Sequence, residues 1–292
     1  MSQELLYMRS PFVYHEGMQL KRYNKKTDVN TLELSKFISR TYINTIDMAI
    51  LDAIYDFEIL NRHCLELYLN LTTKADTKSN LKKLVALGII ARQAYEYEED
   101  YERKQTPYFY SLTPGAFKYL QRFHHDKKHY PIITPDNAYR KLSLNQFHIC
   151  FMNRYSNHVT NCRRNISMTD KGKGIFIDLY YSLSSNQLSQ KLDLYVIPVR
   201  QGYDWQNSFK EYMENFISFL KNSSPIVIFL AESDQHVKEI HKCISDNKIN
   251  LEGKLVLYTT DLGVAREPIL DYLYECSSDA EHTSLNIKKL AI

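Results

Sequence analysis

Residues 77–123 read TKSNLKKLVALGIIARQAYEYEEDYERKQTPYFYSLTPGAFKYLQRF, and this stretch decides the fold of the N-terminal half. Its first twelve residues have the apolar spacing of an amphipathic helix. Four residues would form the inward side of that helix: Leu81, Leu84, Val85 and Leu87. Asp76 or Thr77 is suited to cap the start, and Gly88 stands where a helix end favours a residue with positive φ.

After Gly88 the apolar spacing changes from helical to alternating. Residues 89–100 and 106–114 are rich in aromatic and β-branched residues, which predicts two strands joined by a charged loop near residues 99–104. Residues 115–123 then predict another helix.

Two further helices are predicted upstream. Residues 46–60 place Ile46, Ile50, Ala53, Ile54 and Phe57 at helical spacing, with Asn44 or Thr45 as the cap. Residues 61–71 predict a second helix with four residues facing inward: Cys64, Leu65, Tyr68 and Leu69. Three helices, a hairpin and a helix, in this order, are the layout of a winged helix-turn-helix domain.

The helix at 77–88 is the predicted base-reading element, because the second helix of such a pair fits the major groove. Its outward residues are Thr77, Lys78, Ser79, Asn80, Lys82 and Lys83. Asn80 is suited to adenine, and the three lysines are suited to guanine or phosphate. An ordinary surface helix with solvated lysines is the alternative.

The hairpin tip is acidic, since Arg103 and Lys104 are surrounded by five acids: Glu96, Glu98, Glu99, Asp100 and Glu102. Carboxylates near phosphates weaken DNA binding. Two interpretations follow: either Arg103 and Lys104 alone touch the DNA backbone, or the wing contacts a protein.

The C-terminal half predicts an α/β domain with a mixed or parallel sheet, because apolar strands alternate with helices. Residues 124–143 are polar and contain two prolines, which is typical of a linker. The predicted organisation is an N-terminal extension (1–43), the winged helix-turn-helix domain (44–123), the linker (124–143) and the α/β domain (144–292).

Charge and composition limit the function further. Residues 118–173 hold eleven Lys or Arg and three acids, a net of +8, which favours phosphate binding. No apolar stretch is long enough for a membrane span and the N-terminus does not resemble a signal peptide, so we expect a cytoplasmic protein that contacts no membrane. Five single cysteines predict neither disulfides nor a zinc site.

The helix-turn-helix, LVALGII, the aromatic hairpin, YFYSLTPGAFKYL, the basic linker and QFHICFM together resemble the replication-relaxation family over residues 47–260. Proteins of that family occur on plasmids and integrative elements of low-GC Gram-positive bacteria. The resemblance implies a winged helix domain followed by a restriction-endonuclease-like domain. It also implies a role in plasmid replication, DNA relaxation or conjugative mobilisation.

A nuclease of that fold needs a carboxylate on one strand, then an acid and a lysine two residues apart on the next, to hold Mg²⁺. Asp178 is the candidate for the first carboxylate, but the expected acid and lysine fall near residues 197–199 in IPV. Asp193 has no lysine two residues after it. The domain is therefore predicted to be a degenerate, inactive form of that fold.

Other sites are weaker. His124, His125 and His129 have metal-like spacing without an acidic or Cys partner, and His241 and Cys243 are two apart on a helix, so they point to different faces. We therefore predict no catalytic residues, no metal and no cofactor.

The preferred hypothesis is a non-enzymatic protein of a mobile element that binds double-stranded DNA at an origin or promoter, as a homodimer, and contacts a relaxase or replication initiator. The alternatives are a Mg²⁺-dependent nuclease or nicking accessory that uses Asp178, and a winged-helix module that contacts only proteins.

Overall fold

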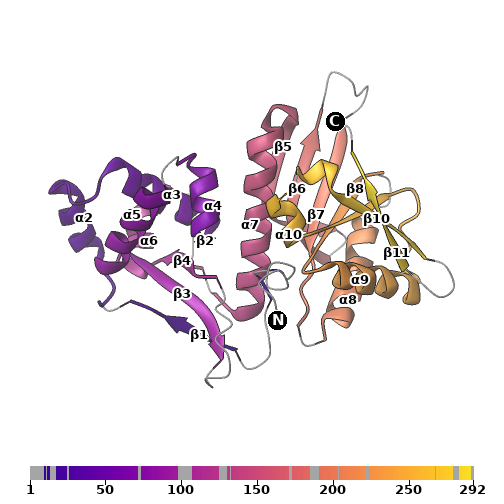
Figure 1. Cartoon of the computed structure of the whole chain (residues 1–292), viewed down its shortest axis with the longest axis horizontal. Helices are drawn as coiled ribbons and strands as arrows, with labels where there is room; N and C mark the ends of the chain where they lie inside the picture. The colour runs from indigo at the N-terminus through magenta and orange to yellow at the C-terminus, as the bar shows by residue number, and fades with distance from the viewer. Residues whose placement is uncertain are drawn as a thin grey trace. The chain divides into compact units, whose positions relative to one another are not determined.

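The computed structural model describes residues 10, 12–13, 18–24, 26–71, 74–97, 107–124, 130–131, 133–170, 173–184, 191–202, 204–220, 224–266, 268–278 and 283–290. Over these residues the chain is a mixed α+β protein with two sheets, as the sequence predicted. It divides into two compact units: the first unit is residues 14–145, and the second unit is residues 146–292 together with residues 1–13. Figure 1 labels most of the helices and strands of both units.

The first unit contains a four-stranded antiparallel sheet in the order β1-β3-β4-β2. Its strands are β1 (Met18–Arg22), β2 (Ile59–Asn61), β3 (Ile90–Tyr97) and β4 (Phe109–Leu112). Strands β3 and β4 form the predicted hairpin, with Ile90 paired to Leu112. The sequence did not predict β1 or β2, because both are short.

The helices of the first unit confirm the predicted order. They are α2 (Thr31–Ser39), α3 (Thr45–Phe57), α4 (Arg62–Tyr68), α5 (Lys74–Ala86), α6 (Pro114–Leu120) and the first part of α7 (Pro135–Tyr155). Asn44 caps α3 as predicted, in a capping box with Asp47. In α4, Cys64 and Leu65 are buried, but Tyr68 is exposed and packs edge-on against Phe57. The inward position predicted for Tyr68 is therefore wrong.

The described residues from 18 onward of the predicted N-terminal extension are folded into the first unit, whereas residues 10, 12 and 13 belong to the second unit. Strand β1 pairs along β3, and the Val29 N–H donates to the Gly88 carbonyl at 3.0 Å. Gly88 has a φ of +73°, as predicted for a helix end, and a Cβ there would lie 2.4 Å from the Thr27 carbonyl oxygen. A Cβ on Gly115 would lie 2.0 Å from the Val29 carbonyl oxygen. Residues 27–30 therefore pack against backbone that only glycine leaves open.

The linker predicted at 124–143 is wrong for residues 135–143, which begin the long helix α7. Pro135 is tolerated there because the first helical position needs no N–H donor. Ala138, Tyr139 and Leu142 are buried at helical spacing, and Tyr139 packs against Tyr95. The polar residues between them hid this apolar stripe.

The second unit is built on a seven-stranded mixed sheet in the order β11-β10-β9-β8-β7-β6-β5. Its strands are β5 (Val159–Asp170), β6 (Lys173–Leu183), β7 (Leu192–Pro198), β8 (Ile226–Ala231), β9 (Leu255–Thr260), β10 (Leu273–Ser278) and β11 (Thr283–Lys288). Strands β7, β8 and β9 are parallel, and the other neighbours are antiparallel. A mixed sheet was predicted, but β5, β10 and β11 were not, because these strands near the sheet edges carry few buried apolar residues.

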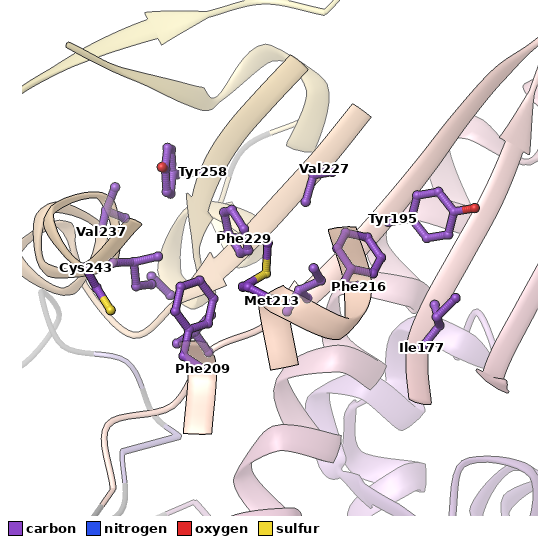
Figure 2. Packing of buried hydrophobic residues seen from close by; sticks show 14 of the residues in the cluster. Ile177, Tyr195, Phe209, Met213, Phe216, Val227, Phe229, Val237, Cys243 and Tyr258 are labelled. Atoms are coloured by element: carbon purple, nitrogen blue, oxygen red, sulfur yellow. The ribbon is translucent and has the colours of Figure 1, made fainter. Parts of the chain in front are cut away.

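Helices α8 (Trp205–Phe219) and α9 (Asp234–Asp246) connect the parallel strands. Figure 2 shows their apolar side chains, including Phe209 and Val237, packed with Phe229 and Tyr258 of the sheet. Tyr181 of β6 instead packs against Phe151 of α7, with ring centroids 4.5 Å apart. The second unit also contains the short helix α10 (Asp261–Arg266) and two 3-10 turns. The turn η1 (Ser156–His158) joins α7 to β5, and the turn η2 (Ile269–Asp271) precedes β10. Among the described residues no helix is long and apolar enough to cross a bilayer.

Candidate nucleic-acid interface

Helix α5 presents a polar surface formed by part of the predicted set. Lys78, Ser79 and Lys82 are exposed and Asn80 is half-buried. On the opposite side, Leu81 and Leu84 are buried. Residues three and four apart share a helix face, so Lys78 and Lys82 lie together on the solvent side. The apolar side of α5 packs against α3, α4 and β3.

Thr77 is wrong as an outward residue, because its side chain is fully buried. The helix begins at Lys74, three residues before the predicted start. Thr77, Leu81 and Leu84 then follow an i, i+4, i+7 spacing, which is the inward side of the helix. The spacing of Thr77 from Leu81 was therefore a signal in the sequence for this inward position.

Lys83 is held by a carboxylate of the protein. Its ammonium forms an ion pair with Asp47, whose side chain is completely buried, while the Lys83 side chain is 35% exposed. The same carboxylate accepts a hydrogen bond from the Asn44 N–H at 2.8 Å in the α3 capping box. Lys83 therefore ties α5 to the start of α3.

Arg103 and Lys104 lie outside the described residues, as do four acids of the predicted hairpin tip: Glu98, Glu99, Asp100 and Glu102. The described hairpin base carries a different basic group. The Arg92 guanidinium lies 4.8 Å from the ring centre of Tyr108 and 5.3 Å from that of Tyr23, and the Tyr23 hydroxyl donates to Glu96. These contacts of the base of the hairpin were not visible in the sequence.

The basic stretch 118–173 does not form one surface of one unit. Lys118 and Arg122 lie at α6 in the first unit, and Lys141 of α7 is paired there with Glu58. Arg154, Arg163 and Arg164 belong to the second unit, at the end of α7 and on β5. The charge run therefore divides between the units.

The two carboxylates considered for a nuclease are not brought together. Asp178 of β6 is 3% exposed. Asp193 of β7 pairs with Ser182, four residues from Asp178, which corresponds to roughly 13 Å along a strand. Asp193 also accepts a hydrogen bond from the Tyr180 hydroxyl at 2.7 Å. Among the described residues, no three His, Cys, Asp or Glu side chains are grouped as metal ligands.

The sequence did not predict the buried polar network at the carboxyl ends of the parallel strands β7, β8 and β9. Arg200 donates to both oxygens of Asp261, at 2.7 and 2.8 Å. Asp261 also accepts from the Ser10 hydroxyl, and its carbonyl accepts from the Gln146 amide at 2.7 Å. The residues of this network come from segments far apart in the sequence, so no local motif predicted it.

Two more titratable groups lie beside this pair. The Glu232 carboxylate accepts from the Gln201 N–H at 3.0 Å, and the Glu232 N–H donates to His236 Nδ1 at 3.3 Å. Burial raises the pKa of Glu232 to about 7, and the nearby Arg200 opposes that rise. Burial and then Arg200 lower the pKa of His236 to about 3. These groups act inside the second unit, with Glu232 and His236 nearly inaccessible to solvent.

The remaining histidines and cysteines have structural surroundings. His124 lies 3.2 Å from Asp52, whereas His125 and His129 are outside the described residues. His241 bonds the Tyr258 hydroxyl and Cys243 is buried, as two different helix faces require. All five cysteines are free. Burial raises the pKa of the Cys150 and Cys162 thiols to about 11, which favours the inert thiol.

Comparison of the chain with protein-family models, with curated proteins and with solved structures finds no match. The candidate interface is therefore argued from its geometry alone.

Proposed function

We propose that the protein binds double-stranded DNA through α5 of a winged helix-turn-helix domain. The observation that carries this proposal is the face of α5: Lys78, Ser79 and Lys82 are solvent-facing on a helix whose other side is fixed in a core. The order of α3, α4, α5, the β3-β4 hairpin and α6 supports it, because that order presents the third helix to a groove.

The chemistry of this face fits a groove lined by base edges and phosphates. Lys78 and Lys82 supply ammonium donors for guanine or phosphate, and the Asn80 amide is suited to adenine. Ser79 adds a hydroxyl that donates or accepts. The buried Thr77 and the ion pair of Lys83 with Asp47 hold α5 in place, and we propose that the other four residues contact the DNA.

In the hairpin tip, we propose that only Arg103 and Lys104 contact the DNA, at its phosphate backbone. Its acidic residues argue against deep insertion of the tip in a groove. Since one helix covers only a few base pairs, we propose that two copies bind paired half-sites.

The biological setting rests on the resemblance to the replication-relaxation family. It favours a mobile genetic element, with a role in plasmid replication, relaxation and mobilisation, or transcriptional control. A relaxase or a replication initiator is the proposed protein partner, and the second unit is the proposed contact for it.

The test replaces the four α5 residues with alanine: Lys78→Ala, Ser79→Ala, Asn80→Ala and Lys82→Ala together. Binding is measured by mobility shift on the DNA upstream of the protein's own coding sequence, with unrelated DNA as competitor. We expect specific affinity to fall by about 100-fold or more, since each base contact contributes about 1 to 3 kcal/mol.

The matched control is Lys238→Ala with Lys242→Ala, because both lysines are exposed on α9 at the same four-residue spacing. This control should bind DNA like the native chain. Unchanged binding by the α5 variant would remove α5 as the reader. Failure of the native chain to bind any DNA at low salt would favour the module that contacts only proteins.

We propose that the protein binds DNA without cutting it, because Asp178 and Asp193 are too far apart to hold one metal ion together. Supercoiled plasmid incubated with the protein and Mg²⁺ should remain supercoiled. A relaxed or linear product that disappears with Asp178→Asn would establish the nuclease alternative.

A further inference from the structure

Helix α2 and the residues before it carry a positive charge that the proposed function does not use. Residues 21–40 contain six Lys or Arg and two acids, a net of +4. Both acids already have partners within the same segment. Asp28 accepts a hydrogen bond from Arg22 at 3.1 Å. Glu33 accepts from the Asn30 N–H at 3.1 Å, in the capping box of α2. The other cations of the segment are therefore not neutralised by these acids.

Three of these cations are exposed at α2: Lys26, Lys36 and Arg40. Lys36 and Arg40 are four residues apart on the helix, so they share one face. The Lys26 ammonium lies 5.7 Å from the centre of the Phe37 ring, which follows Lys36 in the helix. None of the three cations forms an ion pair with another residue that the structure describes. Cations gathered in this way are suited to bind an anionic partner.

An exposed aromatic ring lies beside the cations. Tyr42 is 58% exposed, and its ring packs edge-on against Phe37 with ring centres 6.2 Å apart. Thr41 has a φ of +57°, a conformation that β-branched residues rarely adopt. Two backbone hydrogen bonds hold this turn: the Thr41 N–H donates to the Ile38 carbonyl at 3.0 Å, and the Tyr42 N–H donates to the Phe37 carbonyl at 2.9 Å. The turn therefore holds Tyr42 in position and leaves it exposed.

The combination of cations and an exposed ring favours a single-stranded nucleic acid as the partner. Cations alone would suit any polyanion. The bases of a duplex are stacked on one another, whereas an unpaired strand offers both phosphates and free base faces that stack on aromatic side chains. An anionic membrane would need a wide apolar face. Leu34 of α2 is buried, and of the apolar residues of α2, all of which the structure describes, only Leu32 is exposed.

We propose that α2 and the turn after it bind single-stranded DNA through four residues: Lys26, Lys36, Arg40 and Tyr42. The cations contact phosphates, and one base stacks on the Tyr42 ring. Because Tyr42 is already held against Phe37, it loses little conformational freedom when a base stacks on it. This inference goes beyond the proposed function, since it concerns an unpaired strand and a surface outside α5.

The test measures binding of the full chain to a fluorescent oligothymidylate of about 20 nucleotides, by anisotropy at several salt concentrations. The native chain should bind. Tyr42→Ala should lower the affinity about tenfold and leave its salt dependence unchanged, because it removes stacking and no charge. Tyr42→Trp should bind at least as tightly as the native chain. Lys36→Gln with Arg40→Gln should make the slope of log affinity against log salt shallower by about 1.4, since each phosphate contact on a single strand contributes about 0.7.

The chain offers a matched control for the ring and another for the cations. Tyr68→Ala removes a second exposed tyrosine of the first unit, which also packs edge-on against a phenylalanine, Phe57. Lys238→Gln with Lys242→Gln removes two exposed lysines with the same four-residue spacing on α9. Both controls should bind the oligonucleotide like the native chain.

Three results would each overturn the proposal: a native chain that does not bind the oligonucleotide, a Tyr42→Ala variant that binds like the native chain, or an equal loss in the Tyr68→Ala control. Binding to phosphatidylserine vesicles in place of the oligonucleotide, lost in Tyr42→Ala, would assign the surface to a membrane and would also overturn it. The α5 variant with four alanines should still bind the oligonucleotide, and the α2 variants should keep the specific mobility shift on duplex DNA. The two proposals can therefore fail separately. Loss of oligonucleotide binding in the α5 variant would place the single strand on α5 and contradict this inference.

Discussion

The first unit and the second unit differ in the surroundings of their buried polar groups. In the first unit, the buried Asp47 carboxylate is tied to the Asn44 N–H and to Lys83, a partially exposed lysine. In the second unit, Arg200 and Asp261 form a buried pair beside the Glu232 carboxyl and the neutral His236 ring. The lysine that pairs with the buried carboxylate of the first unit reaches solvent, whereas the arginine that pairs with the buried carboxylate of the second unit is almost buried.

This difference suggests different uses. Exposed lysines on a helix whose other side is buried are suited to contact another molecule, and that is where we propose DNA binding. A buried network that joins residues from 10 to 261 fixes the second unit, and its stability should depend on pH. The single tryptophan, Trp205, packs edge-on against His236 with ring centres 5.0 Å apart, so its fluorescence reports the second unit.

The largest expected effect comes from Gly115→Ala in the first unit. The new Cβ would lie 2.0 Å from the Val29 carbonyl oxygen and 2.9 Å from the Asn30 Cα, and both are backbone atoms that cannot rotate away. We expect a loss of about 3 kcal/mol or more in the free energy of unfolding of this unit. Hydrogen exchange should then be about 100-fold faster in peptides from β3 and β4, while β8 peptides change little.

Gly263→Ala in the second unit is the matched control, because its Cβ would meet only side-chain atoms at 3.4 Å or more. It should change stability by less than about 1 kcal/mol. Equal acceleration of exchange in β3 and β8 by Gly115→Ala would mean that the two units unfold as one.

Much of the fold could be predicted where local signals agree. The Asn44 cap, the apolar spacing of α3 and Gly88 at positive φ were all visible in the sequence, as were the buried strands β8 and β9. Strand β1 could not be predicted, since its place beside β3 depends on pairing between residues about 75 apart. The start of α7 was missed because proline and polar residues outweighed the stripe that contains Tyr139.

The candidate site could also be predicted only in part, because local spacing shows a helix face and does not show contacts between distant residues. Helical spacing gave the exposed side of α5 at Lys78 and Lys82, but Thr77 was taken as outward although it lies four residues before the inward Leu81. The ion pair of Lys83 could not be predicted, because a sequence shows a lysine without showing its partner, here the distant Asp47. The Arg200 and Asp261 pair is a purely tertiary contact, and no spacing rule reaches it.

The next prediction concerns acid. Burial first, and then Arg164 or Arg200, lowers the pKa of both His148 and His236 to about 3, whereas an unfolded histidine titrates near 6.5. The unfolded chain therefore binds more protons between these values, and stability falls as pH drops below about 6.5. Glu232 has the opposite effect on stability. Its raised pKa makes the folded state gain stability as pH falls from about 7 towards 4.5. Two histidines outweigh one carboxyl, so we expect a net loss of a few kcal/mol by about pH 4.

Urea unfolding followed by Trp205 fluorescence at a series of pH values measures this loss. Glu232→Gln removes the opposing group, so its midpoint should fall more steeply with acid and should lie above the native midpoint at pH 8. His148→Gln should reduce the slope by about one proton. Amide exchange in α3 of the first unit should respond less, because His148 and His236 both belong to the second unit. A midpoint that is flat from pH 6.5 to 4.5 would contradict the assignment of two buried neutral histidines.

The smallest effect separates a supporting lysine from a reading lysine on the same helix. Lys83→Met leaves the buried Asp47 without its cation, and we expect a loss of about 1 to 2 kcal/mol in the stability of the first unit, reduced from a fully buried pair by the exposure of Lys83. Lys82→Met should cost almost no stability, because Lys82 is exposed.

DNA binding should show the reverse order: Lys82→Met lowers the slope of log affinity against log salt by about one, and Lys83→Met leaves that slope unchanged. Adding Asp47→Asn to Lys83→Met removes the unpaired charge and should restore part of the lost stability. If Lys83→Met instead reduced the salt slope as Lys82→Met does, Lys83 would belong to the DNA-binding face and the comparison within α5 would fail.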